Sequence, residues 1–306
     1  MKQIPENFEY LKECPVCLSR SFFSFKKRTF NSSFLTKEHI KITDSGYGKI
    51  WDLCRCGNCT HTFANPCPKP AFIQSLYSKI EDPLYQEEAL GRSKNFARIL
   101  SFLEKFHPSR GNIFDVGAAT GILMNIARER GWEPAGIEPS CWAVEVAAQK
   151  YDLQLYEGYF ESARLKQNYY TSVTMVDFIE HIPCPLGAVR KAYEILASNG
   201  TLCVVTPDIN SLAAKTMKGK WWHYRPAHLA YFSLESITHL LSHAGFRILK
   251  NRKYSWTFSA HYLISRLGSL NFLLKKNNLA SFWKKIPIKL ALQDSIEIYA
   301  IKEERK

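Results

Sequence analysis

The stretch NIFDVGAATGILMNIARERGWEPAGIEPS, residues 112–140, decides the fold. It opens with a short apolar run, breaks into small residues, continues with helical periodicity and ends in a second apolar run. This is the order strand, turn, helix, strand. Asp115 precedes the turn, Gly117 and Gly121 lie within it, and Glu138 ends the second strand.

The same alternation continues toward the C-terminus. Strands are predicted at LQLYEG, SVTMVDF, TLCVVTP, FRILKNRKY and SIEIYAIKE, and helices at CWAVEVAAQKYD, LGAVRKAYEILASNG and SLESITHLLSHAG. Nearly continuous apolar strands separated by helices predict a mostly parallel sheet covered on both faces. Residues 71–110 precede this pattern and show helical periodicity, so we predict a helical lead-in there.

The turn and its acidic neighbours indicate a particular ligand. Glycines after a strand let a ligand approach the backbone closely, and the helix that follows offers free N–H groups. The dinucleotide fingerprint G-x-G-x-x-G is not met, because residue 119 is alanine. The carboxylate of Asp115 repels a phosphate and suits an ammonium or sulfonium group, while Glu138 can bind ribose hydroxyls. A ribose with a cationic tail describes S-adenosylmethionine (SAM).

The chain resembles class I SAM-dependent methyltransferases of the bacterial small-molecule type, similar to ubiquinone-biosynthesis-like enzymes, over about residues 75–306. The segments that carry the resemblance are FDVGAATG, GIEPS, VDFIEHIPCP, LASNGTLCVVTP and HLAYFSLESITHLLSHAGF. It implies an α/β fold for residues 71–306, with a Rossmann-like, doubly wound, mostly parallel seven-stranded sheet. It also implies a cofactor site formed by Asp115, Gly117, Ala118, Gly121, Glu138, Pro139, Tyr159, Phe160, Asp177 and Phe178.

Candidate catalytic groups lie in two segments. DFIEHIP places Glu180 and His181 just after the fourth strand, where ligands bind such sheets. These residues, with Asp177, resemble a divalent-metal pattern of some O-methyltransferases, or they only shape the turn. WWHYRPAHLAYFS, residues 221–233, contains His228, which we predict to be a base or substrate contact; a histidine that caps the helix begun by Ser233 is the alternative.

The N-terminal segment, residues 1–70, is predicted to be a zinc ribbon. Cys14 and Cys17 form one C-x-x-C knuckle, and Cys56 and Cys59 form a second. Four thiolates satisfy a tetrahedral zinc ion and leave no open position, which is typical of a structural site. Cys54 is an alternative to Cys56 as a ligand, and a redox role is a further alternative. The segment ANPCPKP is the predicted linker.

The formal net charge is +13, which favours an anionic partner. The segment from Lys250 to Gln293 contains lysines and arginines but no Asp or Glu. We predict a basic helical insertion at 255–293 that forms a lid over the site; contact with an anionic membrane or a phosphate-bearing acceptor is the alternative.

These observations predict a SAM-dependent methyltransferase acting on a small molecule, by O-methylation of a sugar, a glycan precursor or a lipid-like metabolite. An RNA methyltransferase is the alternative, in which the ribbon and the basic segment grip phosphates. A catalytically inactive binding protein is a second alternative. The nine cysteines, the lack of an apolar signal region and the lack of a membrane-length apolar run predict a cytoplasmic protein.

Overall fold

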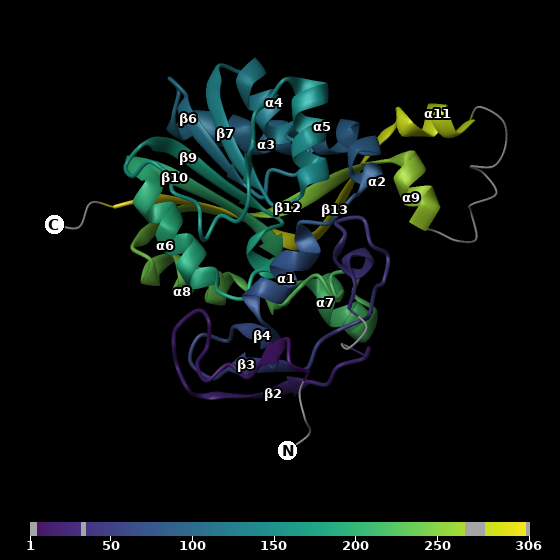
Figure 1. Ribbon diagram of the computed structural model, residues 1–306, viewed down its shortest axis with the longest axis vertical. Helices are drawn as coiled ribbons and strands as arrows, with labels where there is room; N and C mark the ends of the chain where they lie inside the picture. The colour runs from purple at the N-terminus through teal and green to yellow at the C-terminus, as the bar shows by residue number, and fades with distance from the viewer. Residues whose placement is uncertain (1–4, 32–34, 267–278, 304–306) are drawn as a thin grey trace.

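The computed structural model describes residues 5–31, 35–266 and 279–303 (Figure 1). It shows a large sheet with helices on both sides and a smaller β-rich unit formed by the N-terminal segment. None of the helices in the described residues is both long and apolar enough to span a bilayer.

Seven strands of the described chain form the large sheet, in the order β12-β13-β10-β9-β6-β7-β8. The pairs from β10 to β8 are parallel, and β13 runs antiparallel to both β10 and β12. This confirms the predicted mostly parallel seven-stranded sheet. The strands are β6 (Gly111–Val116), β7 (Trp132–Glu138), β8 (Tyr156–Glu157), β9 (Tyr170–Val176), β10 (Leu196–Pro207), β12 (Phe246–Ser259) and β13 (Pro287–Lys302).

Helices cover both faces of this sheet because alternate strand residues point to opposite sides. Ile113 lies in the apolar cluster under one helical layer, whereas the next residue, Phe114, lies in the cluster under the other. One layer contains α3 (Ala89–Phe106), α4 (Ile122–Glu129) and α5 (Cys141–Tyr151); the other contains α6 (Pro185–Ile195) and α8 (Leu234–His243) (Figure 1).

Local sequence fixes where these helices begin. The Ser140 hydroxyl accepts a hydrogen bond from the Ala143 amide and caps α5. Ser233 and Ser236 form a capping box at the start of α8. Two short helices precede α3, namely α1 (Pro70–Tyr77) and α2 (Pro83–Glu87), and each begins at a proline, as the fixed φ of that residue favours.

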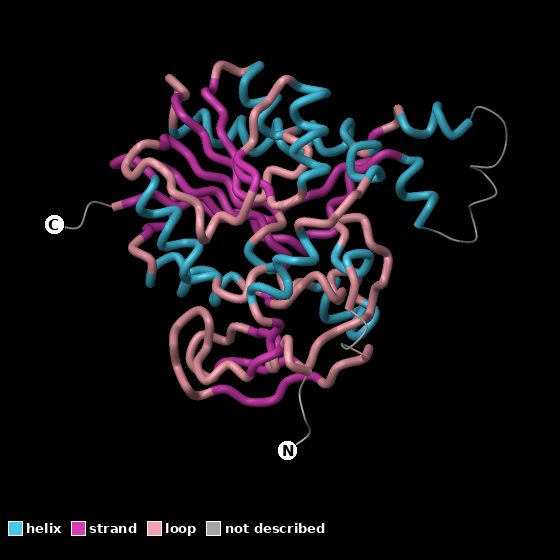
Figure 2. Tube along the Cα trace, viewed as in Figure 1, coloured by secondary structure: helices cyan, strands magenta, loops and turns pink. Residues whose placement is uncertain are grey.

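The N-terminal segment forms a small sheet that a strand from far along the chain completes. Its order is β11-β4-β3-β2, with β2 (Phe22–Lys26), β3 (Leu53–Cys56), β4 (Thr62–Ala64) and β11 (Ala230–Tyr231). Figure 2 shows these short strands apart from the large sheet. A further pair joins β1 (Phe8–Glu9) to β5 (Cys67–Pro68). Because β11 belongs to the segment AHLAYFS, the smaller sheet includes residues from the predicted methyltransferase region.

The predicted helical insertion at 255–293 differs from the structure. Among its described residues only α9 (Ala260–Arg266) and α11 (Leu279–Lys284) are helical, whereas 255–259 and 287–293 extend β12 and β13. The extended strand is anchored on α3, where the Asn95 amide group bonds both the N–H and the C=O of Thr257, at 2.8 and 3.0 Å. Residues 267–278 of the predicted insertion lie outside the described residues.

The remaining described helices are short. They are α7 (Leu212–Met217) and the 3-10 turns η2 (Lys37–Ile40), η3 (Ile179–His181) and η4 (Lys218–Lys220). The turn η3 directly follows β9 and places Glu180 and His181 at the carboxyl edge of the sheet.

Candidate functional site

A cavity of about 800 Å³ lies at the carboxyl edge of the large sheet. One part is lined by Gly117, Ala119, Glu138 and Tyr159, and we name it the glycine-turn side. Another part is lined by Ile42, Tyr77, Asp177 and His181, and we name it the histidine side. The cavity continues along α6 to Arg190 and Glu194. None of the described residues between 250 and 293 lines it, so the described part of the basic segment forms no lid there.

The glycine-turn side is shaped by a backbone that only small residues accept. Gly117 and Gly121 have φ of 73° and 76°, in the left-handed region that favours glycine. A Cβ on Gly117 would lie 3.1 Å from the Phe178 ring, so the turn is also closely packed. Ala119 adopts φ of 46°, at a cost of about 1–2 kcal/mol relative to an ordinary backbone. The turn therefore holds a strained shape, in which the amides of Gly117 and Ala118 bond the Ile137 carbonyl.

Glu138 is the main polar group of this side. Its two carboxylate oxygens accept hydrogen bonds from the amides of Ala119 (2.9 Å) and Ser140 (3.0 Å). Each oxygen retains a second lone pair, so the carboxylate can still accept hydroxyl donors from a ligand. Burial raises the pKa of Glu138 to about 7, although the two amide hydrogen bonds oppose the shift.

Asp115 lies just behind the turn. It is 5% exposed, and the Thr174 hydroxyl donates to its Oδ1 at 2.6 Å. Burial raises the pKa of Asp115 to about 7, and the nearby Glu138 charge adds to the shift. In the part of the chain that the structure describes, no cation lies beside these two buried carboxyl groups, so burial destabilises their ionised forms. A positively charged ligand at this turn would offset that cost.

The histidine side contains a hydrogen-bonded pair from distant segments. The Tyr77 hydroxyl lies 2.9 Å from Nδ1 of His181, and the same Nδ1 lies 3.0 Å from the Ala227 carbonyl oxygen. A carbonyl oxygen can only accept, so Nδ1 carries the proton and Nε2 is the unprotonated nitrogen. Burial lowers the pKa of His181 to about 3, and the positive charge of Arg225 acts in the same direction. His181 is therefore a neutral hydrogen-bond acceptor at physiological pH.

Glu180 and His228 lie next to His181 but behind the cavity wall. One ligand-type atom of each of these three residues lies within 4.8 Å of the others, so the group can hold a metal ion. Glu180 is 1% exposed, and Thr206 donates to its Oε2 at 3.0 Å. Among the described residues, Oε1 of Glu180 and Nδ1 of His228 have no hydrogen-bond partner. Burial raises the pKa of Glu180 and lowers that of His228 well below its usual value.

Asp177 is buried but lies near positively charged side chains, and these two factors act on its pKa in opposite directions. It directly follows β9 and adopts the left-handed region, with φ of 50°, and it lines the cavity. Burial raises its pKa to about 6, whereas the charges of His223, Arg92 and Arg225 oppose the shift. At pH 7.5 Asp177 is consequently mostly ionised, and it is the main negative charge on the histidine side.

The segment of α1 and α2 covers the cavity, a feature that the sequence pattern did not indicate. Tyr77, Asp82 and Tyr85 all line it. The Tyr159 hydroxyl donates to the Gln74 carbonyl at 2.5 Å, and the Thr120 hydroxyl donates to the Gln86 side chain at 2.6 Å. These bonds close the helical segment over the glycine turn. The periodicity of residues 71–110 predicted helices there, but a periodic pattern does not show which other segment a helix packs against.

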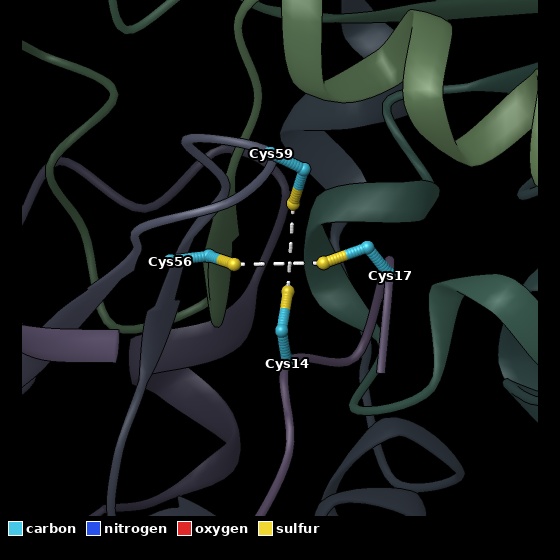
Figure 3. Close-up of side chains that lie close together, drawn as sticks. All are labelled: Cys14, Cys17, Cys56 and Cys59. Atoms are coloured by element: carbon cyan, nitrogen blue, oxygen red, sulfur yellow. Dashed lines mark hydrogen bonds between the residues drawn. The ribbon is translucent and has the colours of Figure 1, made fainter. Parts of the chain in front are cut away.

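The four predicted cysteine ligands come together in the N-terminal unit (Figure 3). Sγ of Cys14 lies 3.6 Å from Sγ of Cys59, and Sγ of Cys17 lies 3.5 Å from Sγ of Cys56. Zinc–sulfur bonds of about 2.3 Å in a tetrahedron require sulfur separations of about 3.8 Å. The cluster therefore fits a structural zinc site of a zinc ribbon. Cys54 is not a member, so Cys56 is the ligand of the pair.

Comparison with known proteins agrees with this geometry. A family model for a methyltransferase domain matches residues 86–251, more than half of the chain. The chain belongs to this methyltransferase family. SAM is the methyl donor that the family fold supports, and the protein is an enzyme of that kind. No curated protein matches the chain in sequence.

Solved structures of methyltransferases resemble the chain at low identity. A SAM-dependent methyltransferase from Archaeoglobus fulgidus is 16% identical, covers 68% of this chain and 94% of its own, and has a TM-score of 0.47. A candidate methyltransferase from Bacillus halodurans is 16% identical, covers 67% of this chain and 100% of its own, and has a TM-score of 0.46. One from Methanosarcina mazei is 13% identical, covers 63% and 93%, and has a TM-score of 0.46.

The predicted site residues of this methyltransferase divide by their access to the cavity. Those that line it are Gly117, Glu138, Pro139, Tyr159, Phe160, Asp177, Phe178 and His181. Those that support the wall from behind, and are absent from the lining among the described residues, are Asp115, Ala118, Gly121, Glu180 and His228. Of the two histidines, the structure thus gives cavity access to His181, whereas the sequence favoured His228.

Proposed function

We propose that this protein is a cytoplasmic SAM-dependent O-methyltransferase. Its acceptor would be a small molecule that presents a hydroxyl group: a sugar, a glycan precursor or a lipid-like metabolite. The observation that carries the proposal is the environment of His181. Its Nδ1–H is held by the Ala227 carbonyl, and the ring lines the cavity beside Tyr77. A neutral imidazole fixed in one tautomer can accept the hydroxyl proton in spite of its low pKa, because the hydroxyl becomes strongly acidic as its oxygen bonds to the methyl carbon.

The residues present also fit the donor. Glu138 would accept hydrogen bonds from the ribose hydroxyls, and Tyr159 and Phe160 would contact the adenine. The buried carboxyl groups of Asp115 and Glu138 favour a ligand that carries positive charge. The bound donor supplies an electrophilic methyl group on a positively charged sulfur. We assign the structural role in the ribbon to Zn²⁺ held by Cys14, Cys17, Cys56 and Cys59.

In the proposed reaction the acceptor oxygen forms a bond to the methyl carbon while the carbon–sulfur bond breaks, and sulfur keeps the electron pair. The hydroxyl proton passes to Nε2 of His181. Tyr77 accepts from the shared Nδ1–H of His181, so its own hydroxyl is free to donate to the acceptor. Most of the rate enhancement comes from alignment of oxygen and methyl, because methyl transfer from a sulfonium needs no covalent intermediate.

The cavity volume supports a small acceptor. About 800 Å³ falls within the range of about 300–1,000 Å³ that is usual for small-molecule sites, and its walls include Ile42, Ile73 and Tyr85. A ring with a hydroxyl at its edge would fit between such apolar side chains and His181.

Label tracing tests the proposal. Zinc-loaded protein is incubated with methyl-labelled SAM and a cell lysate divided into RNA, lipid, glycan and small-molecule pools. We expect label in the glycan, lipid or small-molecule pool, and its loss in the His181→Ala and Asp115→Ala variants. Label confined to RNA would replace this proposal with the nucleic-acid alternative. No label in any pool would favour an inactive binding protein.

A further inference from the structure

The N-terminal ribbon reaches the cavity itself. Ile42, from the segment between the two cysteine knuckles, lines the histidine side. Its side chain also packs against the apolar cluster that contains Tyr85 and Ala119, a residue of the glycine turn. An aliphatic side chain of the ribbon therefore lines the cavity and packs beside the glycine turn.

Thr43, the residue after Ile42, anchors the ribbon segment to Asp82. The Thr43 amide donates to Oδ2 of Asp82 at 2.9 Å, and the Thr43 hydroxyl donates to Oδ1 of the same carboxylate at 2.5 Å. Thr43 is 5% exposed and Asp82 is 3% exposed. Hydrogen bonds to a buried carboxylate are stronger than those between neutral groups, so these two bonds hold the segment firmly. The ribbon segment is thus tied to the loop that precedes α2.

Arg225 anchors the same ribbon segment through the backbone carbonyls of Lys41 and Ile42. Its Nη1 donates to the Ile42 carbonyl at 2.9 Å, and its Nη2 donates to the Lys41 carbonyl. Arg225 belongs to the same loop as His228 and Ala227, the residue whose carbonyl orients His181. One guanidinium therefore links the ribbon segment to the loop that sets the tautomer of the proposed base.

The rest of the ribbon strengthens this attachment. Strand β4 pairs with β11, and the Trp51 indole donates to the Pro226 carbonyl at 3.0 Å. The apolar cluster on this side includes Trp51, Trp221 and Tyr224 together. The ribbon is packed as part of the cavity wall along this whole loop.

We propose that Ile42, held in place through Lys41 and Thr43, forms part of the wall of the acceptor site and is a specificity-determining residue. The inference rests on the proposed function, since it concerns the acceptor of that reaction. Truncation of the Ile42 side chain would remove an apolar contact between the protein and the acceptor. It would leave the polar contacts between Glu138 and SAM, the methyl donor, in place. A contact of this size is worth about tenfold in affinity.

The experiment compares Ile42→Ala with Ile126→Ala. Ile126 packs against the same apolar cluster but lies on α4, away from the cavity lining. With SAM saturating, the acceptor pool that wild-type protein labels is titrated, and the SAM dissociation constant is measured by calorimetry. We expect Ile42→Ala to raise the half-saturating acceptor concentration about tenfold. The maximal rate and the SAM affinity of Ile42→Ala should stay within about twofold of the wild-type values. In Ile126→Ala the half-saturating acceptor concentration, the maximal rate and the SAM affinity should all be unchanged.

Ile42→Val is a second variant for the case in which Ile42→Ala does not fold, because valine keeps most of the packing. It should raise the half-saturating acceptor concentration by a smaller factor. An unchanged half-saturating concentration in folded Ile42→Ala and Ile42→Val would overturn the inference. So would an equal loss of SAM affinity, which would assign Ile42 to the donor. If wild-type protein labels no small-molecule pool, the proposed function fails first and this inference falls with it.

Discussion

The two sides of the cavity are built in different ways. The glycine-turn side comes mainly from consecutive residues: β6, the turn, α4 and β7 supply it within 111–140, and Tyr159, just after β8, adds one side chain. The histidine side draws on the ribbon, α1, the turn after β9 and the loop 221–231. A side made by one local motif depends on little else, whereas one assembled from four segments depends on how they pack. Changes far from the cavity should therefore alter the histidine side first.

Loss of the ribbon metal should have the largest effect. In Cys59→Ser the site loses a thiolate, and structural zinc contributes about 10–16 kcal/mol to folding in small zinc domains. We expect zinc content to fall from about one per chain. Hydrogen exchange should rise in residues 221–231 and stay low in 111–121. Cys54→Ser is the control and should keep its zinc. An equal rise of hydrogen exchange in residues 221–231 and 111–121 would show that loss of the metal affects both sides of the cavity alike.

Removal of His181 should have the next largest effect. Without a group to take the hydroxyl proton, the rate of methyl transfer in His181→Ala should fall about 10²–10⁴-fold, with SAM affinity unchanged. His228→Ala should lose much less, because His228 does not reach the cavity. Rates at saturating SAM, together with calorimetry, check both. The opposite ranking would restore His228 as the base.

Glu138→Gln should weaken the glycine-turn side alone. The substitution removes the charge that accepts the ribose hydroxyls, and one amide hydrogen would face a backbone N–H of Ala119 or Ser140. We expect SAM affinity to fall about 10–100-fold, which corresponds to a loss of about 1.5–3 kcal/mol. Glu157→Gln, at the end of the neighbouring strand β8, is the matched control. A fall in maximal rate without a loss of affinity would contradict this role.

The pH dependence should be smaller, and of opposite sign for binding and for stability. Burial raises the pKa of Asp115 and Glu138 to about 7, and SAM is a cation, so its affinity should rise from pH 6 to pH 8. The rise is at most about tenfold per pH unit for each proton released.

Without ligand the sign reverses. The folded pKa of both groups lies above the unfolded value, so their stabilising contribution is complete below about pH 4 and is lost as pH rises through 7. Calorimetry with SAM and thermal unfolding in the same buffers check the two trends. Glu138→Gln should flatten both, and a SAM affinity that does not change with pH would show that neither carboxyl must ionise.

The sequence predicted most of the sheet because its strands and helices carry strong periodicity. It also predicted Glu138 and the four cysteines from their spacing; Glu138 lines the cavity and the four cysteines lie together, and their roles stay predictions. It ranked His228 above His181 because two histidines near the fourth and fifth strands look alike until the Ala227 carbonyl and Tyr77 are seen to orient one of them. Ile42 and Asp82 could not be found, because their position depends on packing between segments distant in the chain.

The pairing of β4 with β11 affects how the chain folds during its synthesis. A ribosome adds about 5–20 residues per second, so roughly 10–30 s separate the synthesis of the two strands. During that interval the edge of β4 has no partner, and an unpaired edge can join another chain. A nascent chain that stalls before Ala230 keeps this edge exposed. Any N-terminal fragment meant to fold alone therefore has to be supplied with the segment 221–231.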